Sequence, residues 1–208
     1  MTSSGFNRTA FMPETKSVED EADARDVAAA QVDVAAFAPL FQRYWPRVYR
    51  YCALRCACSA DAEDVASQIF VRALAKLPAF ESRGPGAFRR WLFTIAHHEV
   101  ASRARYEARH PARALDLASE HAALSGPSPE HAAISAADAD ALLALVRDLP
   151  PRLREVVELR LVGLTDREIA EVLGISSPAV RKAQSRALAH LRRQVSPLVS
   201  EEEHHHAG

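Results

Sequence analysis

The sequence predicts an all-α protein made of two small helical domains joined by a flexible linker. Apolar residues recur at spacings of three and four along several segments, as the buried face of an amphipathic helix requires. None of these segments shows the strict alternation that indicates a half-buried β-strand. Residues 111–135, rich in Ala, Ser, Pro and acidic side chains, separate two groups of helical segments and have the composition of a linker.

The N-terminal residues 1–35 are polar and acidic and lack a sustained apolar period, which predicts a disordered tail. An amphipathic helix is expected to follow, where apolar residues recur at helical spacing. Pro46 lies inside this pattern and is expected to kink or restart the helix. The apolar positions are Phe37, Leu40, Phe41, Tyr44, Val48 and Tyr51.

A second helix is predicted from Asp61 to Leu77, and Pro78 is expected to end it. Asp61 can cap its N-terminus. Glu63 and Asp64 lie in its first turn, where negative charge suits the positive end of the helix dipole.

The segment Ala79–Ala87 contains two glycines and one proline, and we predict a loop there. A third helix is expected from about Phe88 to Ala108, completing a first domain over residues 36–110. Trp91 on this helix could stack on a nucleic-acid base. Because aromatic residues at helical spacing are more often core residues, we assign Trp91 to the core.

The second predicted domain covers residues 136–195. Helices are expected from Ala136 to Leu149 and from Arg152 to Val162, with two prolines between them. The pattern Thr165-x-x-Glu168 is a capping box that begins a short helix.

Gly174 is placed to end this short helix. Ser177 and Pro178 then supply an N-cap and a first-turn proline for a final helix that runs to about Gln194, and residues 196–208 are expected to be a disordered tail. Two helices joined by a short glycine turn predict a helix-turn-helix that binds DNA, although an interaction bundle can share this pattern. The side chains available for a major groove are Ser176, Ser177, Ala179, Arg181, Lys182, Ser185 and Arg186.

The formal net charge of −1 hides an uneven distribution. Residues 36–110 carry +6 and residues 141–200 carry +4, whereas residues 1–35 and 111–140 carry −4 each. The two basic blocks coincide with the two predicted domains. The charge pattern therefore favours a nucleic-acid partner, which the average charge alone would argue against.

Several classes of protein are disfavoured. No apolar run approaches the roughly 20 residues of a membrane span, and the N-terminus lacks a hydrophobic signal core, so we expect a cytoplasmic protein without membrane insertion. No nucleotide-binding, hydrolase or zinc-protease motif is present, and we predict no catalytic residue, metal site or cofactor. Cys52, Cys56 and Cys58 are too few and too close for a disulfide framework. A thiol or metal switch remains a hypothesis beside their commoner use as buried small residues.

Two stretches resemble one family when they are read together. AEDVASQIFVRALAKL followed by FRRWLFTIAHHEVASRAR is similar to region 2 of the extracytoplasmic-function sigma factors, the small promoter-specificity subunits of bacterial RNA polymerase. LPPRLREVVELRLVGLTDREIAEVLGISSPAVRKAQSRALAHLRR resembles region 4 of the same family. The resemblance implies an alternative sigma factor that binds core RNA polymerase, recognises the −10 and −35 promoter elements and helps to melt DNA.

The same resemblance implies the partners and their contact residues. The partners are core RNA polymerase, through its largest-subunit clamp helices and its flap, promoter DNA and an anti-sigma factor. The recognition helix would read the −35 element, and the loop Ala79–Ala87 would receive a flipped base of the −10 element. Polymerase contacts fall on Glu63, Asp64, Val65, Gln68, Ile69 and Phe70, and −10 contacts on Arg83, Gly84, Arg89, Arg90, His98, Ser102, Arg103, Arg105 and Arg109.

The chain also departs from the family pattern. His98 stands where the family usually has Asn, and Ser102 stands where Asp is frequent, so the −10 preference of the family does not transfer directly. A stand-alone helix-turn-helix regulator that binds duplex DNA without polymerase is the alternative reading. The region 2 resemblance discriminates against this alternative, because a simple regulator needs no polymerase-docking and melting helices.

Overall fold

A computed structural model describes residues 13–56, 58–109 and 144–205, with side chains described between residues 18 and 194. Every regular element in this part of the chain is a helix, which confirms the predicted fold class. The predicted linker, 111–135, and the start of the helix predicted from residue 136 lie outside the described residues.

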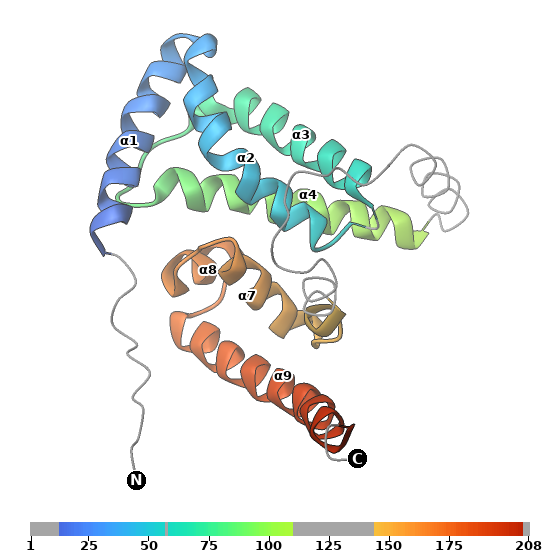
Figure 1. Cartoon of the computed structure of the whole chain (residues 1–208). Coiled ribbons are helices and arrows are strands. Elements are labelled where there is room, and N and C mark those ends of the chain that lie inside the picture. Colours follow the sequence, from blue (N-terminus) through green and yellow to red (C-terminus); the bar gives the residue numbers. More distant parts are fainter. Residues whose placement is uncertain (1–12, 57, 110–143, 206–208) are drawn as a thin grey trace.

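The first group of helices is built around α2, α3 and α4, which pack on one another (Figure 1). A further helix, α1, crosses α2 and α4. The elements are α1 (Pro13–Val32), the 3-10 helix η1 (Val34–Phe37), α2 (Ala38–Ala53), α3 (Ser59–Lys76), the 3-10 helix η2 (Leu77–Ala79) and α4 (Ala87–Arg109).

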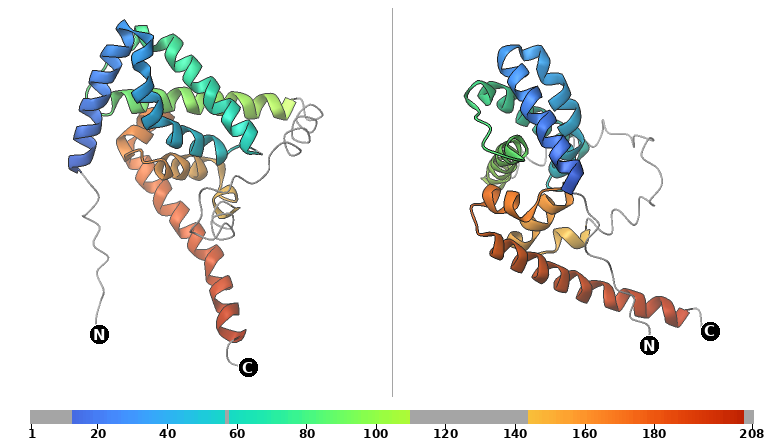
Figure 2. Two further views of the ribbon diagram at one scale, coloured as in Figure 1. Left: turned by 45° about the horizontal axis from the view of Figure 1, so that its top comes forward. Right: turned by 90° about the vertical axis from the view of Figure 1, so that its left-hand side faces the viewer.

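The second group begins with helical residues 144–147 and continues with α7 (Pro151–Leu161), α8 (Asp166–Leu173) and α9 (Ser177–His205). Figures 1 and 2 show this group lying against the first, with α8 next to α4. One cluster of buried apolar side chains runs through both groups, from Leu40 and Ile69 to Leu159 and Ile169. The two groups are therefore packed together and not merely tethered.

The predicted N-terminal tail is wrong for residues 13–35, because α1 and η1 occupy them; residues 1–12 lie outside the described residues. Asp23, Val27 and Ala30 of α1 are buried. The Tyr44 hydroxyl donates a 2.5 Å hydrogen bond to Asp23, and the Gln31 amide donates to two backbone carbonyls at the end of α3 and after it. Two of these three buried residues, Asp23 and Ala30, are not large apolar side chains, so the segment shows no repeating apolar pattern. For this reason the sequence predicted a disordered tail instead of a helix.

Two local expectations also change. Pro46 lies inside α2 without ending it; its missing N–H leaves the carbonyl of Gln42 without a helical donor, and Gln42 is exposed to water. The N-cap of α3 is Cys58, whose Sγ accepts from the Asp61 N–H at 3.4 Å. Asp61 is instead buried and pairs with Arg103 at 2.5 Å. Its carboxylate therefore binds an arginine of another helix, α4, and does not cap α3.

The C-terminal tail predicted over residues 196–208 is likewise wrong as far as residue 205, because α9 continues to His205. Within the described residues, no helix is both long enough and apolar enough to cross a membrane.

Candidate nucleic-acid interface

The α8–turn–α9 unit has the predicted helix-turn-helix geometry. Thr165 and Glu168 form the capping box: the Glu168 N–H donates to Thr165 Oγ1 at 3.3 Å, and the Thr165 N–H donates to Glu168 Oε2 at 2.7 Å. Gly174 ends α8 with a left-handed φ of +64°, a conformation that glycine adopts without steric cost. Ser176 Oγ accepts from the Ala179 N–H at 3.3 Å, so Ser176, and not the predicted Ser177, caps α9, which begins at Ser177.

The outer face of α9 is basic and accessible. Val180 is fully buried and anchors the helix, which turns the residues on either side of it outward. Arg181, Lys182 and Arg186 are exposed along this face. The remaining predicted contact residues are exposed at Ser176, Ala179 and Ser185 and half-buried at Ser177. A protruding helix with these donors fits a major groove.

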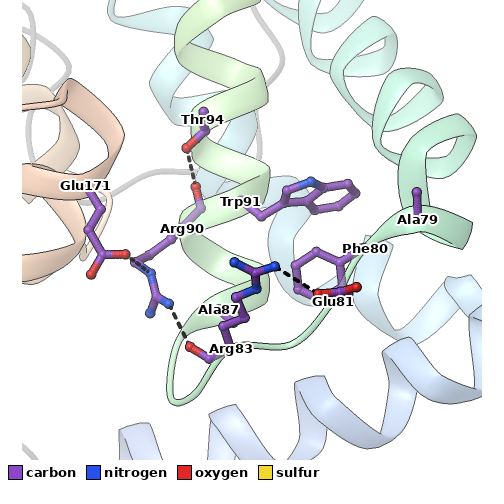
Figure 3. Close-up of a pocket in the computed structure, with 9 residues that line it drawn as sticks. All are labelled: Ala79, Phe80, Glu81, Arg83, Ala87, Arg90, Trp91, Thr94 and Glu171. Carbon is purple, nitrogen blue, oxygen red and sulfur yellow. Dashed lines mark hydrogen bonds and ion pairs between the residues drawn. The ribbon is translucent and has the colours of Figure 1, made fainter.

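A pocket of about 500 Å³ lies where the loop before α4 meets the first turns of that helix. Trp91 packs against Phe80, with ring centroids 4.8 Å apart, and against Phe88 at 5.6 Å. Its indole is half-buried and also lines the pocket (Figure 3). Trp91 therefore packs on core residues, as predicted, and also forms part of the pocket wall. The pocket is lined by Ala79, Phe80, Glu81, Arg83, Ala87, Arg90, Trp91, Thr94 and Glu171.

Arg90 shapes this pocket. Its guanidinium donates to the carbonyls of Pro85 at 2.5 Å and Arg83 at 3.2 Å, which ties the loop to α4. Its Nε also pairs with Glu171 of α8 at 2.6 Å, as the dashed lines in Figure 3 show. Arg83 is exposed and pairs with Glu81. An aromatic wall with adjacent guanidinium groups suits an unstacked base and its phosphate.

Arg89 is placed differently from the sequence prediction. It is only 1% exposed, so it cannot contact DNA in this arrangement. Glu168 Oε1 lies 2.6 Å from one of its terminal nitrogens, and Glu19 and Asp20 of α1 lie at 2.9 and 3.2 Å. Burial alone would lower the pKa of Arg89, but hydrogen bonds and charge from Glu168 hold this pKa above its ordinary value.

The outer half of α4 carries the other predicted −10 contacts. His98, Ser102, Arg105 and Arg109 are exposed along it, and Gly84 is exposed in the loop. Arg103 is half-buried by its ion pair with Asp61. These positions form an accessible edge that continues from the pocket along one helix.

The predicted polymerase contacts divide into two kinds. Glu63, Asp64 and Gln68 are exposed on α3. The other three belong to the core of the first group and do not face solvent in this conformation: Val65 is 2%, Ile69 0% and Phe70 4% exposed. The stripe at helical spacing faces α2 and α4, and only the polar flank remains available.

Sequence reasoning missed a row of aromatic side chains on the neighbouring helix, α2. Phe41 is 38% exposed and stands 5.1 Å from Trp45, ring centroid to ring centroid. Trp45 stacks on Tyr49 at 6.3 Å. Their i, i+4 spacing was a usable signal, because two of these residues lie outside the predicted apolar stripe. This row borders the core residue Phe70 of α3.

Two of the three cysteines have structural roles, Cys52 in the core and Cys58 at a helix end. Cys52 is fully buried, and burial raises the pKa of its thiol to about 12, which keeps it protonated and unreactive. Cys58 caps α3. Among the described residues, no group of three His, Cys, Asp or Glu side chains is arranged to hold a metal ion.

Comparison with known proteins matches both helical groups to regions of one protein family. Residues 40–110 match Sigma-70 region 2, and residues 139–191 match Sigma-70 region 4. The ECF RNA polymerase sigma factor ShbA of Streptomyces griseus is 36% identical over 172 residues, which cover 79% of this chain and 90% of that protein. The ECF RNA polymerase sigma factor SigD of Mycobacterium tuberculosis is 32% identical over 178 residues, 83% of each chain.

Two solved structures are similar to this fold. CnrH, solved in complex with the cytosolic domain of CnrY, aligns with a TM-score of 0.64 and 26% identity over 85% of this chain and 98% of that chain. The sigma factor RpoE, solved in complex with the anti-sigma factor NepR from Bartonella quintana, aligns with a TM-score of 0.58 over 76% and 94% of the two chains. At 20% identity the second likeness concerns the fold alone.

Proposed function

The chain belongs to the extracytoplasmic-function family of RNA polymerase sigma factors, and we propose that its two helical groups divide the work of promoter recognition between them. It is an alternative sigma factor, which binds core RNA polymerase, recognises −10 and −35 promoter elements and helps to melt DNA. In this proposal residues 36–110, region 2, bind polymerase and the −10 element. Residues 136–195, region 4, bind the flap and the −35 element.

The observation that carries this division is the pairing of two different DNA-binding surfaces on the two groups. The outer face of α9 presents Arg181, Lys182 and Arg186 to a duplex. The Trp91 pocket has an aromatic wall and guanidinium groups that suit a base taken out of the stack. One surface therefore fits double-stranded DNA and the other fits melted DNA.

Magnitudes indicate that the pocket cannot melt DNA by itself. Unstacking and unpairing one base costs a few kcal/mol, and stacking on an aromatic side chain returns only about 1–3 kcal/mol. The remaining free energy must come from contacts that polymerase adds. As a sigma factor the chain is assigned no catalytic activity and no cofactor, and we place its work in the cytoplasm with the polymerase that it directs.

The polymerase contact is proposed for the polar flank of α3 and the aromatic row Phe41–Trp45–Tyr49 on α2. Exposed carboxylates beside accessible aromatic rings are a common composition for a protein interface. This assignment keeps Glu63, Asp64 and Gln68 from the sequence prediction and replaces its buried members with the aromatic row.

An alanine at Gln68 or Asp64 is expected to weaken capture of core polymerase by roughly fivefold or more, as truncating an interface side chain worth about 1 kcal/mol does. Both residues are exposed, so the unfolding midpoint should not change. Pull-down of tagged protein with titrated core enzyme measures the effect. Lys76→Ala, exposed at the far end of α3, is the control. Wild-type capture by both variants would remove α3 from the interface.

The whole function is tested by run-off transcription with purified core polymerase on genomic promoter fragments. Adding the protein should produce promoter-specific transcripts that core enzyme alone does not make. Absence of any specific transcript across the fragments would overturn the proposal.

We also propose an anti-sigma partner. The support is that the sigma factor RpoE, which shares this fold, was solved in complex with the anti-sigma factor NepR, and that CnrH, which this chain matches over 98% of its length, was also solved with a protein partner, the cytosolic domain of CnrY.

A further inference from the structure

A second pocket lies between the two helical groups, where α7 of region 4 meets the end of α2 and the second half of α4. Its volume is about 340 Å³, near the lower end of the range of about 300–1,000 Å³ that small-molecule sites occupy. It shares no described residue with the Trp91 pocket, and its described lining residues are not among the promoter contacts assigned above. This second pocket is therefore a separate candidate site.

The most buried polar side chain that lines this second pocket is Glu158 of α7. It is 0% exposed, and Arg55 Nε donates to its Oε2 at 2.5 Å. Its Oε1 is also buried, but no donor among the described residues reaches this atom. Burial raises the pKa of Glu158, although charge and a hydrogen bond from Arg55 oppose the rise. Because a buried oxygen without a donor costs free energy, this position favours a ligand that brings an N–H group.

Region 4 also supplies two guanidinium groups to the lining, from Arg147 and Arg154. Arg154 Nη2 donates to the Leu149 carbonyl at 3.1 Å, whereas its Nε is buried and meets no acceptor in the described part of the chain. Helix α7 begins at this edge of the pocket, and no side chain in its described first turn caps the helix or carries an acidic group. The positive end of the helix dipole therefore adds to the two guanidinium groups.

The charge balance of the lining favours an anion. Arg55 neutralises Glu158, which leaves Arg147 and Arg154 facing the single carboxylate of Glu155. One positive charge remains for a ligand to compensate. Guanidinium groups bind phosphate with paired N–H donors, so a phosphate suits this side of the pocket.

The remaining wall is apolar and comes from region 2. Leu54, at the end of α2, is 7% exposed, and Val100 of α4 is 4% exposed. An apolar wall suits the flat ring of an organic ligand better than a bare inorganic ion. Because region 2 gives this wall and region 4 gives the two unpaired arginine positions, the pocket is complete only while the regions are packed together.

We propose that this pocket binds a nucleoside 5′-monophosphate, with its phosphate on Arg147 and Arg154 and an N–H of its base on Glu158 Oε1. The base lies against Leu54 and Val100. This class of molecule combines the three features that the lining requires: an anion at one end, a flat ring and a hydrogen-bond donor on that ring. The pocket volume suits one nucleotide. The inference goes beyond promoter recognition and uses neither the −10 nor the −35 assignment.

The first arm of the test is isothermal titration calorimetry of the full-length protein with AMP, CMP, GMP and UMP. At least one of the four should bind, one molecule per chain, with a dissociation constant of about 0.1 mM or lower. Its nucleoside lacks the phosphate and ribose 5-phosphate lacks the base, and each should bind about tenfold weaker or worse. Absence of binding by all four nucleotides would overturn the site. Ribose 5-phosphate that binds as tightly as the nucleotide would overturn the placement of the base on Glu158.

The second arm compares two arginine variants of α7. Arg154→Ala should weaken nucleotide binding about tenfold or more and leave nucleoside binding nearly unchanged, because it removes only the contact to the phosphate. Arg152→Ala removes the same charge from an exposed position that does not line the pocket, and it should bind the nucleotide as wild type does. Equal nucleotide affinities for the two variants would overturn the phosphate position.

A structural effect of Arg154→Ala is separated from a binding effect by the nucleoside and by heat. If Arg154 only supported the fold, its removal would weaken nucleotide and nucleoside alike, and that result would also overturn the phosphate position. Saturating nucleotide should raise the midpoint of thermal unfolding of the wild type and of Arg152→Ala, and raise that of Arg154→Ala less at the same concentration. An equal rise in all three proteins would place the nucleotide elsewhere on the chain.

Discussion

Truncating Ile69 to alanine is expected to lower the free energy of unfolding by about 2–5 kcal/mol, the usual range for removing most of a buried aliphatic side chain. Ile69 is 0% exposed on α3, where the predicted apolar stripe meets α2 and α4. Because Ile69 is fully buried, the loss combines transfer free energy with missing contacts. Urea unfolding followed by circular dichroism measures it.

The neighbouring Gln68→Ala supplies the matched control. Gln68 is exposed, so its removal should leave the urea midpoint within error while polymerase capture falls. Ile69→Ala should show the converse: a lower midpoint, with capture normal at temperatures where the variant stays folded. An Ile69→Ala protein with full stability and lost capture would restore Ile69 to the interface that the sequence predicted.

Removing both Arg181 and Arg186 should weaken binding of the holoenzyme to a promoter fragment by about 30-fold or more. Each direct contact of this kind is worth about 1–3 kcal/mol, and the two side chains are exposed on separate turns of α9. Loss of two cations should also reduce the slope of log affinity against log salt by about two, where the contacts are to phosphates. Filter binding at several salt concentrations gives both quantities.

Arg167→Ala is the control for this loss of charge. Arg167 is exposed on α8 and pairs with Glu171, away from the outer face of α9. Its removal should change promoter affinity little. If the double variant keeps wild-type affinity and salt slope on a promoter that the wild type transcribes, α9 is not the −35 reading helix.

Many elements of this fold could be predicted because their causes are local. The capping box at Thr165 and Glu168, the left-handed Gly174 and the stop of α3 before Pro78 depend on residues a few positions apart. The recognition face followed from the same reasoning, since burial of Val180 sets which side of α9 faces outward. Charge by segment also marked the two stretches that match the sigma-factor family models, although the whole-chain charge of −1 concealed them.

Three of the failures, at α1, Asp61 and Arg89, share one physical cause. A charged side chain is buried only where a distant partner compensates it, and the sequence does not say which partner arrives. Asp23 is buried because Tyr44 and Arg43, about 20 positions away in the sequence, donate hydrogen bonds to it. These contacts hold α1 against α2, although the composition of the segment predicts a disordered tail.

The sequence by itself determined α2, α3, α4, α7 and α8, the helix-turn-helix and the family, because these follow from spacing along one chain segment; it missed α1 and the C-terminal end of α9. Only the tertiary structure decided which arginines remain available to DNA. Arg89 and Arg90 are adjacent in the sequence, yet Arg89 is enclosed by Glu168, Glu19 and Asp20 while Arg90 borders the base pocket. Glu168 lies 79 positions from Arg89, so the sequence alone does not show that these two side chains pair. The pairing follows only from the packing of the two regions.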